Sequence, residues 1–584
     1  MKISVRVRGE WLQVPCKKGD ETIQWLSEES VRRYFRLQSG SNQQRLKTES
    51  ILSVRKTRGG AILDPKDGVA DVLDDNDFIS VVLESDKPHP VTDQPQIKYI
   101  PEQIAASELP TDQYLTLDGN TLTPDDLVML GKGSYRIRLS KESEEKVVRA
   151  RKIVDRIVRE NKDYLWITTG VGKFARTVIP QSDIEAVQLN VIRSHSAGVG
   201  NPLSPDKTRM LLALRVNVLA KGHSGISLKT LQQYIDAFNA SCLPWVPEKG
   251  TVGASGDLAP LSHLALGLLG EGKMWSPKTG WGNAATVLEA YNLKPLSLGA
   301  KEALALINGT QLISSFGAEA VVRAENIAKQ GDIVASLTLE VLKGTSRAFD
   351  ESVMKLRNHK GQQEVAKRLT ALLHSETYPS EIAESHRFCN RVQDAYTLRC
   401  CPQVHGIVHD TINFVRGILT DELNSATDNP IILSDRGEII SAGNFHGEYP
   451  AKVLDYLAIA IHEMASMSER RIERLVNPAY SELPAFLVKE GGMNSGFMLA
   501  HCTAASLVSE NKVLCHPASV DSLTTSGGTE DHVFYGWICS TKSSNSCRKR
   551  GKSHRHRASR GLSSDRIPSA SQDYSTSRRS HKSS

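Results

Sequence analysis

The sequence lacks the features that mark a membrane or secreted protein. No apolar run approaches the roughly 20 residues that cross a bilayer, and residues 1–8 contain no apolar segment of a secretory leader. The nine cysteines form no Cys-x-x-Cys pair, so they do not indicate a disulfide framework. We therefore expect a cytoplasmic protein with reduced thiols, and no membrane as a partner.

An excess of charge of one sign is also missing from most of the chain. The formal net charge is +6, but residues 541–584 hold twelve Lys and Arg against two Asp and Glu. The rest of the chain is therefore slightly acidic and lacks the basic pattern typical of specific nucleic-acid binding. The tail is rich in serine and poor in large apolar residues, so we expect it to be disordered.

Metal-binding motifs are incomplete as well. His462-Glu463 resembles the start of a zinc-protease helix, but Ser466 stands where the second histidine belongs. His405 and His409 are one helical turn apart, without an evident third ligand. We therefore expect these histidines to be structural, and the sequence predicts no metal site.

The apolar pattern divides the chain into four segments. We expect residues 1–86 to form a small β-grasp-like module and residues 87–113 a proline-rich linker. Residues 114–540 are dominated by helical spacing, and residues 541–584 are the basic tail. The predicted fold class is therefore mainly α, a long-helix bundle with a small α+β N-terminal module. Its long helices are expected at Lys207–Leu219, Ala303–Ala328, Val404–Leu419 and Ala451–Leu475.

The most informative stretch is residues 250–263. Its centre, Ala254-Ser255-Gly256, is short and unhindered, and Asp257 is a good N-cap for the helical pattern that follows. The free backbone N–H groups at such a helix start stabilise a negatively charged group placed next to them. An isolated Ala-Ser-Gly is more typical of a glycine turn before a buried helix than of a catalytic site.

With its long context, the stretch resembles the signature of the aromatic amino acid ammonia-lyases, a family with a helical bundle of the fumarase/aspartase type. The resemblance implies that the Gly256 nitrogen attacks the Ala254 carbonyl carbon and that two waters are lost. The product is a 4-methylidene-imidazol-5-one (MIO) ring, in which Ser255 becomes an exocyclic methylene. Catalysis by Ala254, Ser255 and Gly256 would then need no external cofactor.

Further blocks carry the resemblance to about Val533. It implies that His195 and Glu530 recognise an imidazole side chain and that Arg399 clamps the substrate carboxylate. Gln393, Tyr396 and Arg399 are three residues apart, which predicts one helical face. The full set of implied substrate-binding residues is His195, Asn308, Gln393, Tyr396, Arg399, Phe445 and Glu530.

Two departures from the family pattern stand out. The family tyrosine usually assigned as the base for the β-proton is Leu165 here, with Trp166 and Val171 also altered, and leucine cannot move protons. After Val533 the chain leaves the family pattern, and we expect an altered reading frame or an alternative terminal exon.

The resemblance implies a histidine-selective lyase that converts L-histidine to trans-urocanate and ammonia, the first step of histidine degradation. It also implies a homotetramer whose active sites combine residues from several subunits. Because of Leu165 we expect slow turnover. The alternatives are an impaired family member acting as a binding or regulatory subunit, and an MIO aminomutase, which His195 and Glu530 disfavour. A polyanion-binding role for the tail is weakest, because aromatic residues are not interleaved with its basic ones.

Overall fold

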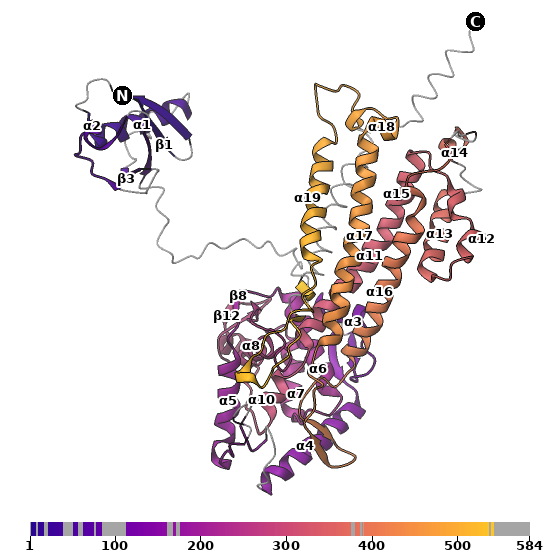
Figure 1. The fold of residues 1–584 in the computed structure, drawn as a ribbon. Helices are drawn as coiled ribbons and strands as arrows, with labels where there is room; N and C mark the ends of the chain where they lie inside the picture. Colours follow the sequence, from indigo (N-terminus) through magenta and orange to yellow (C-terminus); the bar gives the residue numbers. More distant parts are fainter. Residues whose placement is uncertain are drawn as a thin grey trace. The chain divides into compact units, whose positions relative to one another are not determined.

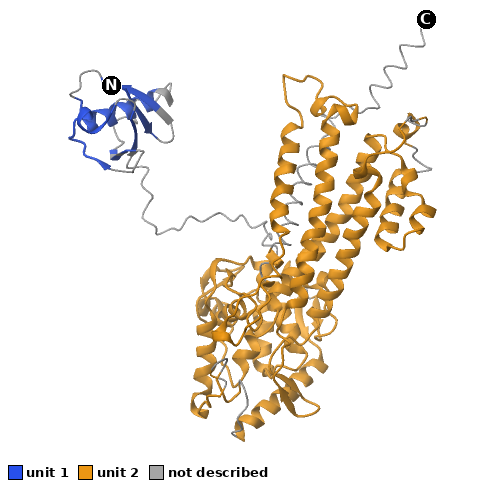
Figure 2. Ribbon diagram, viewed as in Figure 1, with its two compact units in different colours: residues 1–103 blue, residues 104–584 orange. Residues whose placement is uncertain are grey.

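The computed structural model divides into two compact units, residues 1–103 and residues 104–584 (Figure 2). It describes residues 2–7, 10–16, 21–38, 51–56, 62–74, 77–83, 113–160, 167–170, 174, 176–374, 380–385, 388, 391–536 and 539–541. The expected linker is therefore described only at residue 113, and of the basic tail only residue 541 is described. Leu165, Trp166 and Val171 lie outside the described residues.

Unit 1 is a mixed sheet with one long helix. Its strands lie in the order β2-β1-β5-β3-β4, with β1 and β5 parallel and the other neighbours antiparallel. Ile3, Val5 and Val7 alternate along β1 and are buried, as period-two spacing predicts. The elements are β1 (Lys2–Val7), β2 (Glu10–Pro15), α1 (Ile23–Gln38), β3 (Ile51–Lys56), β4 (Ile62–Leu63), α2 (Val69–Val72) and β5 (Phe78–Leu83).

Unit 2 is dominated by helices, of which α11, α16, α17 and α19 run side by side (Figure 1). Val453, Leu457 and Ile461 repeat at helical spacing on α17 and are buried against α11 and α16. The helices of this bundle are α11 (Gln311–Val341), α12 (Glu351–Lys355), α13 (Lys360–Leu373), α14 (Glu381–Ser385), α15 (Tyr396–Arg399), α16 (Cys401–Leu423), α17 (Glu448–Val476), α18 (Pro478–Ser481) and α19 (Met498–Leu514).

Shorter helices and small sheets form the body at one end of the bundle (Figure 1). Its centre is α6, which is buried almost all round and packs on α3 and α7. The helices are α3 (Pro124–Gly131), α4 (Lys141–Arg159), α5 (Ile184–His195), α6 (Pro205–Ala220), α7 (Leu228–Asn239), α8 (Leu258–Leu268), α9 (Ala284–Glu289) and α10 (Glu302–Ile307). The strands are β6 (Tyr114–Leu117), β7 (Arg136–Leu139), β8 (Val199–Pro202), β9 (Leu243–Pro244), β10 (Pro247–Lys249), β11 (Lys273–Ser276), β12 (Gly280–Asn283), β13 (Ile431–Leu433) and β14 (Glu438–Ile440).

The single helix predicted at Ala303–Ala328 is wrong in one respect. The chain leaves helical geometry at residues 308–310, between α10 and α11, where Gly309 has φ +144°. The apolar spacing continues across this break, so periodicity alone does not reveal it. The break frees the backbone of residues 308–310 for contacts with the Ala254-Ser255-Gly256 segment.

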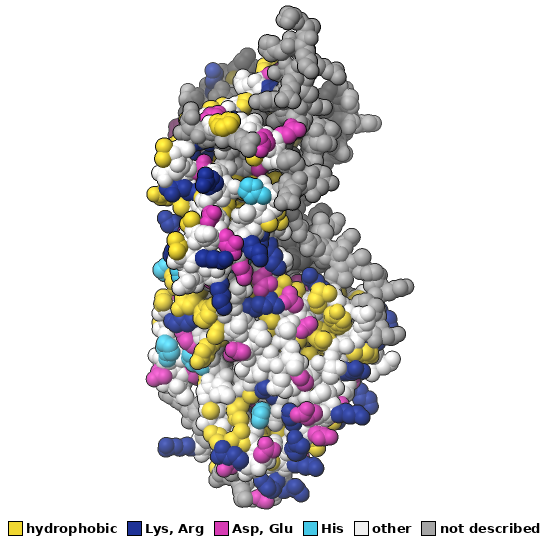
Figure 3. Space-filling view, turned by 90° about the vertical axis from the view of Figure 1, so that its right-hand side faces the viewer, with side chains coloured by type: hydrophobic (Ala, Val, Ile, Leu, Met, Phe, Trp, Pro, Cys, Tyr) yellow, Lys and Arg dark blue, Asp and Glu magenta, His cyan; other side chains and the backbone are white. Residues whose placement is uncertain are grey.

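The structure confirms the predicted fold class, a mainly helical bundle with a small α+β module at the N-terminus. Within the described ranges, no helix is both long and apolar enough to cross a membrane. On the face shown in Figure 3, Lys and Arg are interspersed with Asp and Glu, and no broad patch of one sign is visible.

Candidate active site

The segment Ala254-Ser255-Gly256 forms a tight backbone turn. The Gly256 N–H donates to the Gly253 carbonyl at 3.2 Å, which closes the turn around Ala254 and Ser255. Ser255 adopts φ +51°, a left-handed conformation that costs a non-glycine residue about 1–2 kcal/mol. The chain therefore reverses sharply at Ser255, between the two atoms that the MIO ring would join.

Gly256 lies against the backbone of Gly309. The two residues form an isolated parallel bridge, and the Asp257 N–H donates to the Gly309 carbonyl at 2.7 Å. A Cβ on Gly256 would lie 2.3 Å from the Gly309 oxygen, and Gly256 has φ +82°. Only glycine fits this position without displacing backbone, so these residues meet the steric requirement for ring formation.

Asn308 contacts the central serine directly. The Ser255 hydroxyl donates to Asn308 Oδ1 at 3.2 Å, and Asn308 Nδ2 donates to the Asn429 carbonyl at 2.9 Å. The Asn308 side chain is buried, so both bonds are made away from water. The structure thus brings Asn308 to the segment, as the resemblance implies.

A buried arginine holds the backbone of Asn308. Arg215, on α6, donates from Nη1 to the Asn308 carbonyl at 2.8 Å and to Gln311 Oε1 at 2.5 Å, and from Nη2 to the Ala305 carbonyl. Complete burial lowers the pKa of Arg215, while the negative charge of Asp428 opposes this shift. Arg215 thereby occupies the carbonyl end of α10, where backbone acceptors lack helical partners.

Asp257 has a different role from the one predicted. It precedes α8 but makes no side-chain capping bond to that helix. Its Oδ2 instead accepts from the backbone N–H groups of Leu312 at 2.9 Å and Ile313 at 3.1 Å, in the first turn of α11. Burial raises the pKa of Asp257 to about 7, although these hydrogen bonds oppose the rise. The carboxyl group fastens the start of α11 to the loop that contains the triad Ala254-Ser255-Gly256, called the triad loop below.

Phe445 lies in a loop that is bonded to the same network. The Asn429 Oδ1 atom accepts from the Ala442 N–H at 2.7 Å, and Asn444 Nδ2 donates to the Ala426 carbonyl at 3.2 Å. Phe445 itself is half-buried. The chain of contacts from Ser255 through Asn308 and Asn429 places the Phe445 loop beside the triad loop.

Glu530 is also brought to this region. The Tyr535 N–H donates to the Val252 carbonyl at 3.1 Å, so the segment after Glu530 is bonded to the triad loop. Phe534 is fully buried against Gly253, where an added Cβ would lie 2.7 Å from its ring. Glu530 Oε2 is buried without a hydrogen-bond partner among the described residues. It is therefore an acceptor with unused capacity on a segment that is bonded to the triad loop.

His195 is the last residue of α5. Its Nδ1 lies 2.8 Å from the Val191 carbonyl, a contact within its own helix. The following strand β8 pairs with β10, which leads directly into the triad loop, and the Gly198 N–H donates to His263 Nε2 at 3.0 Å. These contacts place the His195 segment next to the triad loop and α8.

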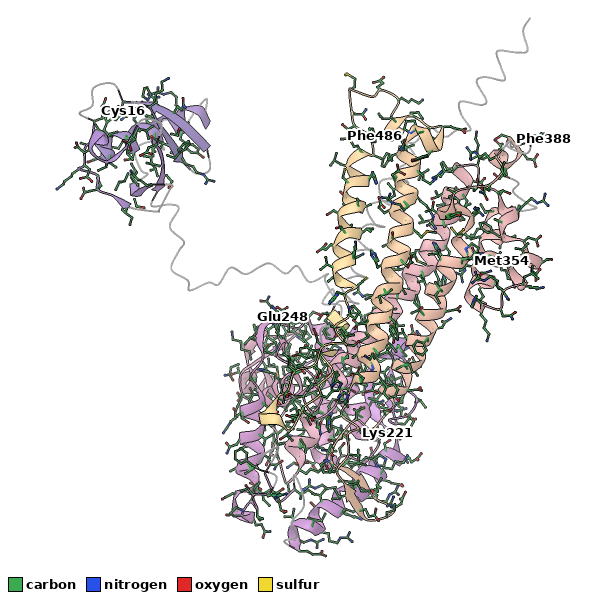
Figure 4. All side chains as sticks on the ribbon, in the orientation of Figure 1. Cys16, Lys221, Glu248, Met354, Phe388 and Phe486 are labelled. Carbon is green, nitrogen blue, oxygen red and sulfur yellow. The ribbon has the colours of Figure 1, made fainter. Side chains whose placement is uncertain are left out.

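Gln393, Tyr396 and Arg399 are not brought to this region within one chain. The nearby Asp394 accepts from the Thr345 N–H at 2.7 Å, beyond the C-terminal end of α11, whereas the triad loop is bonded to the N-terminal end. The 31 residues of α11 span about 45 Å. In Figure 4, Phe388 accordingly lies at the end of the bundle that points away from the body, whereas Glu248, just before the triad loop, lies at the edge of the body.

The predicted shared helical face is only partly correct. Tyr396 and Arg399 both lie on α15, with the guanidinium carbon 4.8 Å from the Tyr396 ring centroid. Gln393 precedes the helix, whose N-cap is Ala395, and is exposed. The spacing of three residues therefore does not put all three on one helix.

Sequence reasoning missed Arg215, Asn429 and Phe534. Arg215 looks like an ordinary member of a helix, because the contacts that define its role come from residues about 90 positions away. Asn429 precedes a proline and carries no local sign of its bond to Asn308. For Phe534 the signal was partly available, since glycines at 253, 447 and 536 are the small residues that leave room for its ring.

Comparison with known proteins relates the whole arrangement to a family. Residues 122–550 match the family model described as aromatic amino acid lyase, and residues 1–87 match the model for the N-terminal of Par3 and HAL proteins. The chain is 62% identical over 537 residues to histidine ammonia-lyase from Bos taurus, covering 92% of this chain and 81% of that one. It is 53% identical to histidine ammonia-lyase from Caenorhabditis elegans, covering 93% and 82% of the two chains.

Solved structures show the same fold. Histidine ammonia-lyase from Trypanosoma cruzi matches with a TM-score of 0.70 at 51% identity, covering 76% of this chain and 82% of that one. Tyrosine aminomutase from Streptomyces globisporus matches with a TM-score of 0.70 at 34% identity, covering 75% and 86%. This chain therefore belongs to the aromatic amino acid lyase family, the class of MIO-dependent enzymes, and within it to the histidine ammonia-lyase branch.

Proposed function

We propose that this protein is a histidine ammonia-lyase that eliminates ammonia from L-histidine to give trans-urocanate. The observation that carries the proposal is the Ala254-Ser255-Gly256 turn, closed against Gly309 and bonded to Asn308. The high identity to curated histidine ammonia-lyases over most of the chain supports the same activity. These relatives favour a working enzyme over an impaired regulatory subunit.

The cofactor proposed for this site is the chain's own MIO ring, formed autocatalytically from Ala254, Ser255 and Gly256. The ring supplies a carbon electrophile, which no standard side chain offers. The bent turn and the bare Gly256 leave room for the Gly256 nitrogen to approach the Ala254 carbonyl. Asn308 accepts from the Ser255 hydroxyl and so fixes its direction before water is lost.

The substrate-binding roles follow from the chemistry of each side chain. His195 and Glu530 lie on segments bonded to the triad loop or to the strand before it and can offer polar partners to an imidazole. Glu530 keeps one oxygen free of partners among the described residues. Arg399 suits the substrate carboxylate, since a guanidinium donates two parallel hydrogen bonds. Phe445 provides an apolar wall. Gln393 and Tyr396, close to Arg399 in the sequence, are proposed to bind the substrate together with it. In the reaction the Cα–N bond breaks as a base removes a β-proton.

A cytoplasmic homotetramer is the proposed assembly. Several large apolar side chains of the bundle are exposed, including Ile333 and Leu337 on α11 and Ile407 and Phe414 on α16, each at least 47% accessible. Exposed apolar surface of this kind is typical of interfaces. Packing other copies against it would also bring Arg399 of one copy toward the triad loop of another.

The activity is tested by following urocanate absorbance with L-histidine and, separately, cinnamate absorbance with L-phenylalanine. We expect L-histidine to be preferred, and His195→Leu to reduce that preference by about 5- to 150-fold, because losing a polar partner costs about 1–3 kcal/mol. Equal kcat/KM for both amino acids in the unaltered protein would contradict the substrate assignment. Release of a β-amino acid in place of ammonia would show an aminomutase.

A further inference from the structure

Three potential metal ligands meet where the Phe445 loop enters α17. They are His446 in the loop, Glu448 in the first turn of α17, and His532 in the segment after Glu530. One ligand atom of each residue lies within 4.8 Å of the ligand atoms of the other two. The three residues come from segments about 85 positions apart, so their meeting is a product of the fold.

The two histidines are held in a defined arrangement. Their rings are parallel to within 1°, with centroids 5.9 Å apart, and His446 Nε2 lies 3.4 Å from the His532 carbonyl oxygen. The ring of the buried Phe534 lies 5.4 Å from that of His446 and supports it from the core. His446 and Glu448 are half-buried and His532 is exposed, so the cluster is open on one side.

Glu448 has an unsatisfied oxygen at this point. Its Oε1 lies 3.2 Å from Lys452 Nζ, but its Oε2 is buried and has no hydrogen-bond partner among the described residues. A buried carboxylate oxygen without a partner is costly, and a nearby cation removes this cost. The orphaned oxygen is thus an observation independent of the spacing of the three residues.

We propose that His446, Glu448 and His532 bind one divalent transition-metal ion, with Zn²⁺ as the ion that suits them best. Two imidazoles and one carboxylate are a ligand set that Zn²⁺ takes, with a fourth position open to water. Tetrahedral ligands at zinc distances lie about 3.3 Å apart. The exposed His532 has the freedom to close the remaining gap by changing its side-chain rotamer.

The ion would lie between the two segments that carry the substrate contacts Phe445 and Glu530. Its effect on the reaction rests on the proposed function. His446 directly follows Phe445, and His532 lies two residues after Glu530. A bound ion would therefore tie together the two segments that carry these substrate contacts. We expect it to change KM for L-histidine more than kcat.

The test is a titration of the full-length, chelator-treated protein with Zn²⁺ and with Co²⁺. We expect one ion per chain in the unaltered protein, with visible Co²⁺ absorption typical of nitrogen and oxygen ligands. Affinity should fall at least about tenfold in Glu448→Gln and in His532→Ala, since each removes a ligand. His359→Ala, which changes an exposed histidine elsewhere on the surface, is the matched control and should bind like the unaltered chain.

Three results would overturn the proposal. They are no binding by the unaltered chain, unchanged affinity in both ligand variants when circular dichroism shows them folded, and an intense near-ultraviolet Co²⁺–thiolate band that places the ion at a cysteine. The Ser255→Ala variant separates this test from that of the enzymatic activity. It cannot form the MIO ring, yet its metal affinity should be unchanged.

Discussion

Arg215 is the residue on which the geometry of Asn308 depends most, although it does not contact Ser255 in the described hydrogen-bond network. It is fully buried and donates to two carbonyls at the end of α10 and to the Gln311 side chain. A charged group in this setting is stabilised by its acceptors, and removing it leaves them unpaired. Arg215 is therefore a positioning residue for Asn308.

Replacing Arg215 by methionine should lower the yield of the modified ring and destabilise the protein by about 3–5 kcal/mol. Arg215→Lys should recover part of both, because it restores one charged donor. Arg209→Met is the control, since Arg209 is buried on the same helix but donates to the carbonyls of Leu130 and Phe238. Peptide mass spectrometry and thermal melting measure the two effects. Equal ring yields in the folded Arg215→Met and Arg209→Met proteins would refute the positioning role.

Leu165 is a second single residue whose replacement tests the account, although it lies outside the described residues. If the family tyrosine is the base, Leu165→Tyr should raise kcat by roughly 10²–10⁴-fold with little change in KM. Tyr164→Phe should have little effect, since the resemblance assigns the base to position 165 and not to position 164. Steady-state kinetics with L-histidine decide the matter. If the unaltered chain already matches the Leu165→Tyr rate, another group is the base.

At the scale of the elements, one buried carboxylate on α11, that of Asp332, contacts both α13 and α16. Asp332 on α11 accepts from His405 Nδ1 at 2.7 Å and His409 Nε2 at 2.9 Å, both on α16, and pairs with Arg368 on α13. His405 Nε2 in turn accepts from Arg471 of α17 at 2.8 Å. The prediction that His405 and His409 are structural is consistent with these contacts.

Asp332→Asn should destabilise the protein by about 3–5 kcal/mol at pH 7, because it leaves the Arg368 guanidinium without its anion. Burial alone would raise the pKa of Asp332, but hydrogen bonds from His405 and His409 lower it well below its usual value. The ionised carboxylate therefore contributes stability that is fully present above about pH 4, the pKa of an unfolded aspartate, and is lost as the pH falls further.

Melting temperatures between pH 7 and pH 3 test this expectation. The difference between the unaltered protein and Asp332→Asn should be constant above about pH 5 and shrink below pH 4. Asp236→Asn, which alters a carboxylate bonded to Gln232 on α7, should stay within about 0.5 kcal/mol throughout. A difference that does not shrink in acid would argue against an ionised Asp332.

The elements also show how far sequence reasoning reaches. The apolar periodicity of α16 and α17 predicted both helices to within a few residues, because their buried faces repeat regularly. The break before α11 was missed, since its cause is the pairing of Gly309 with Gly256, more than 50 positions away. The cap role of Asp257 was misassigned for the same reason. Local signals identify helices, but not which distant backbone a side chain meets.

At the scale of the whole molecule, the two halves of the proposed substrate site lie at opposite ends of α11. Asn308, Phe445 and Glu530 were expected near the triad and lie on segments linked to its loop, whereas Arg399 does not. No sequence pattern gives the distance between such groups, because it depends on the length and course of the long helices. With the substrate roles proposed above, a complete site takes its Arg399 from a second copy of the chain.

Co-expression of two inactive variants tests this arrangement. Ser255→Ala and Arg399→Ala should each lose most activity, and hetero-oligomers containing both should regain it, because some sites then combine an intact triad with an intact Arg399. Co-expressed Ser255→Ala and Asn308→Ala should not recover, since those residues contact each other within one chain. Absence of recovery in the first pair, with tetramers demonstrated by light scattering, would contradict shared active sites.

The central claim is that this chain builds its own electrophile at residues 254–256. Mass spectrometry of the proteolytic peptide that contains Ala254-Ser255-Gly256 tests it most directly. We predict a peptide lighter than its sequence mass by two water molecules in the unaltered protein, and the full mass expected from its sequence in Ser255→Ala. An unmodified peptide recovered from folded, unaltered protein would contradict the account.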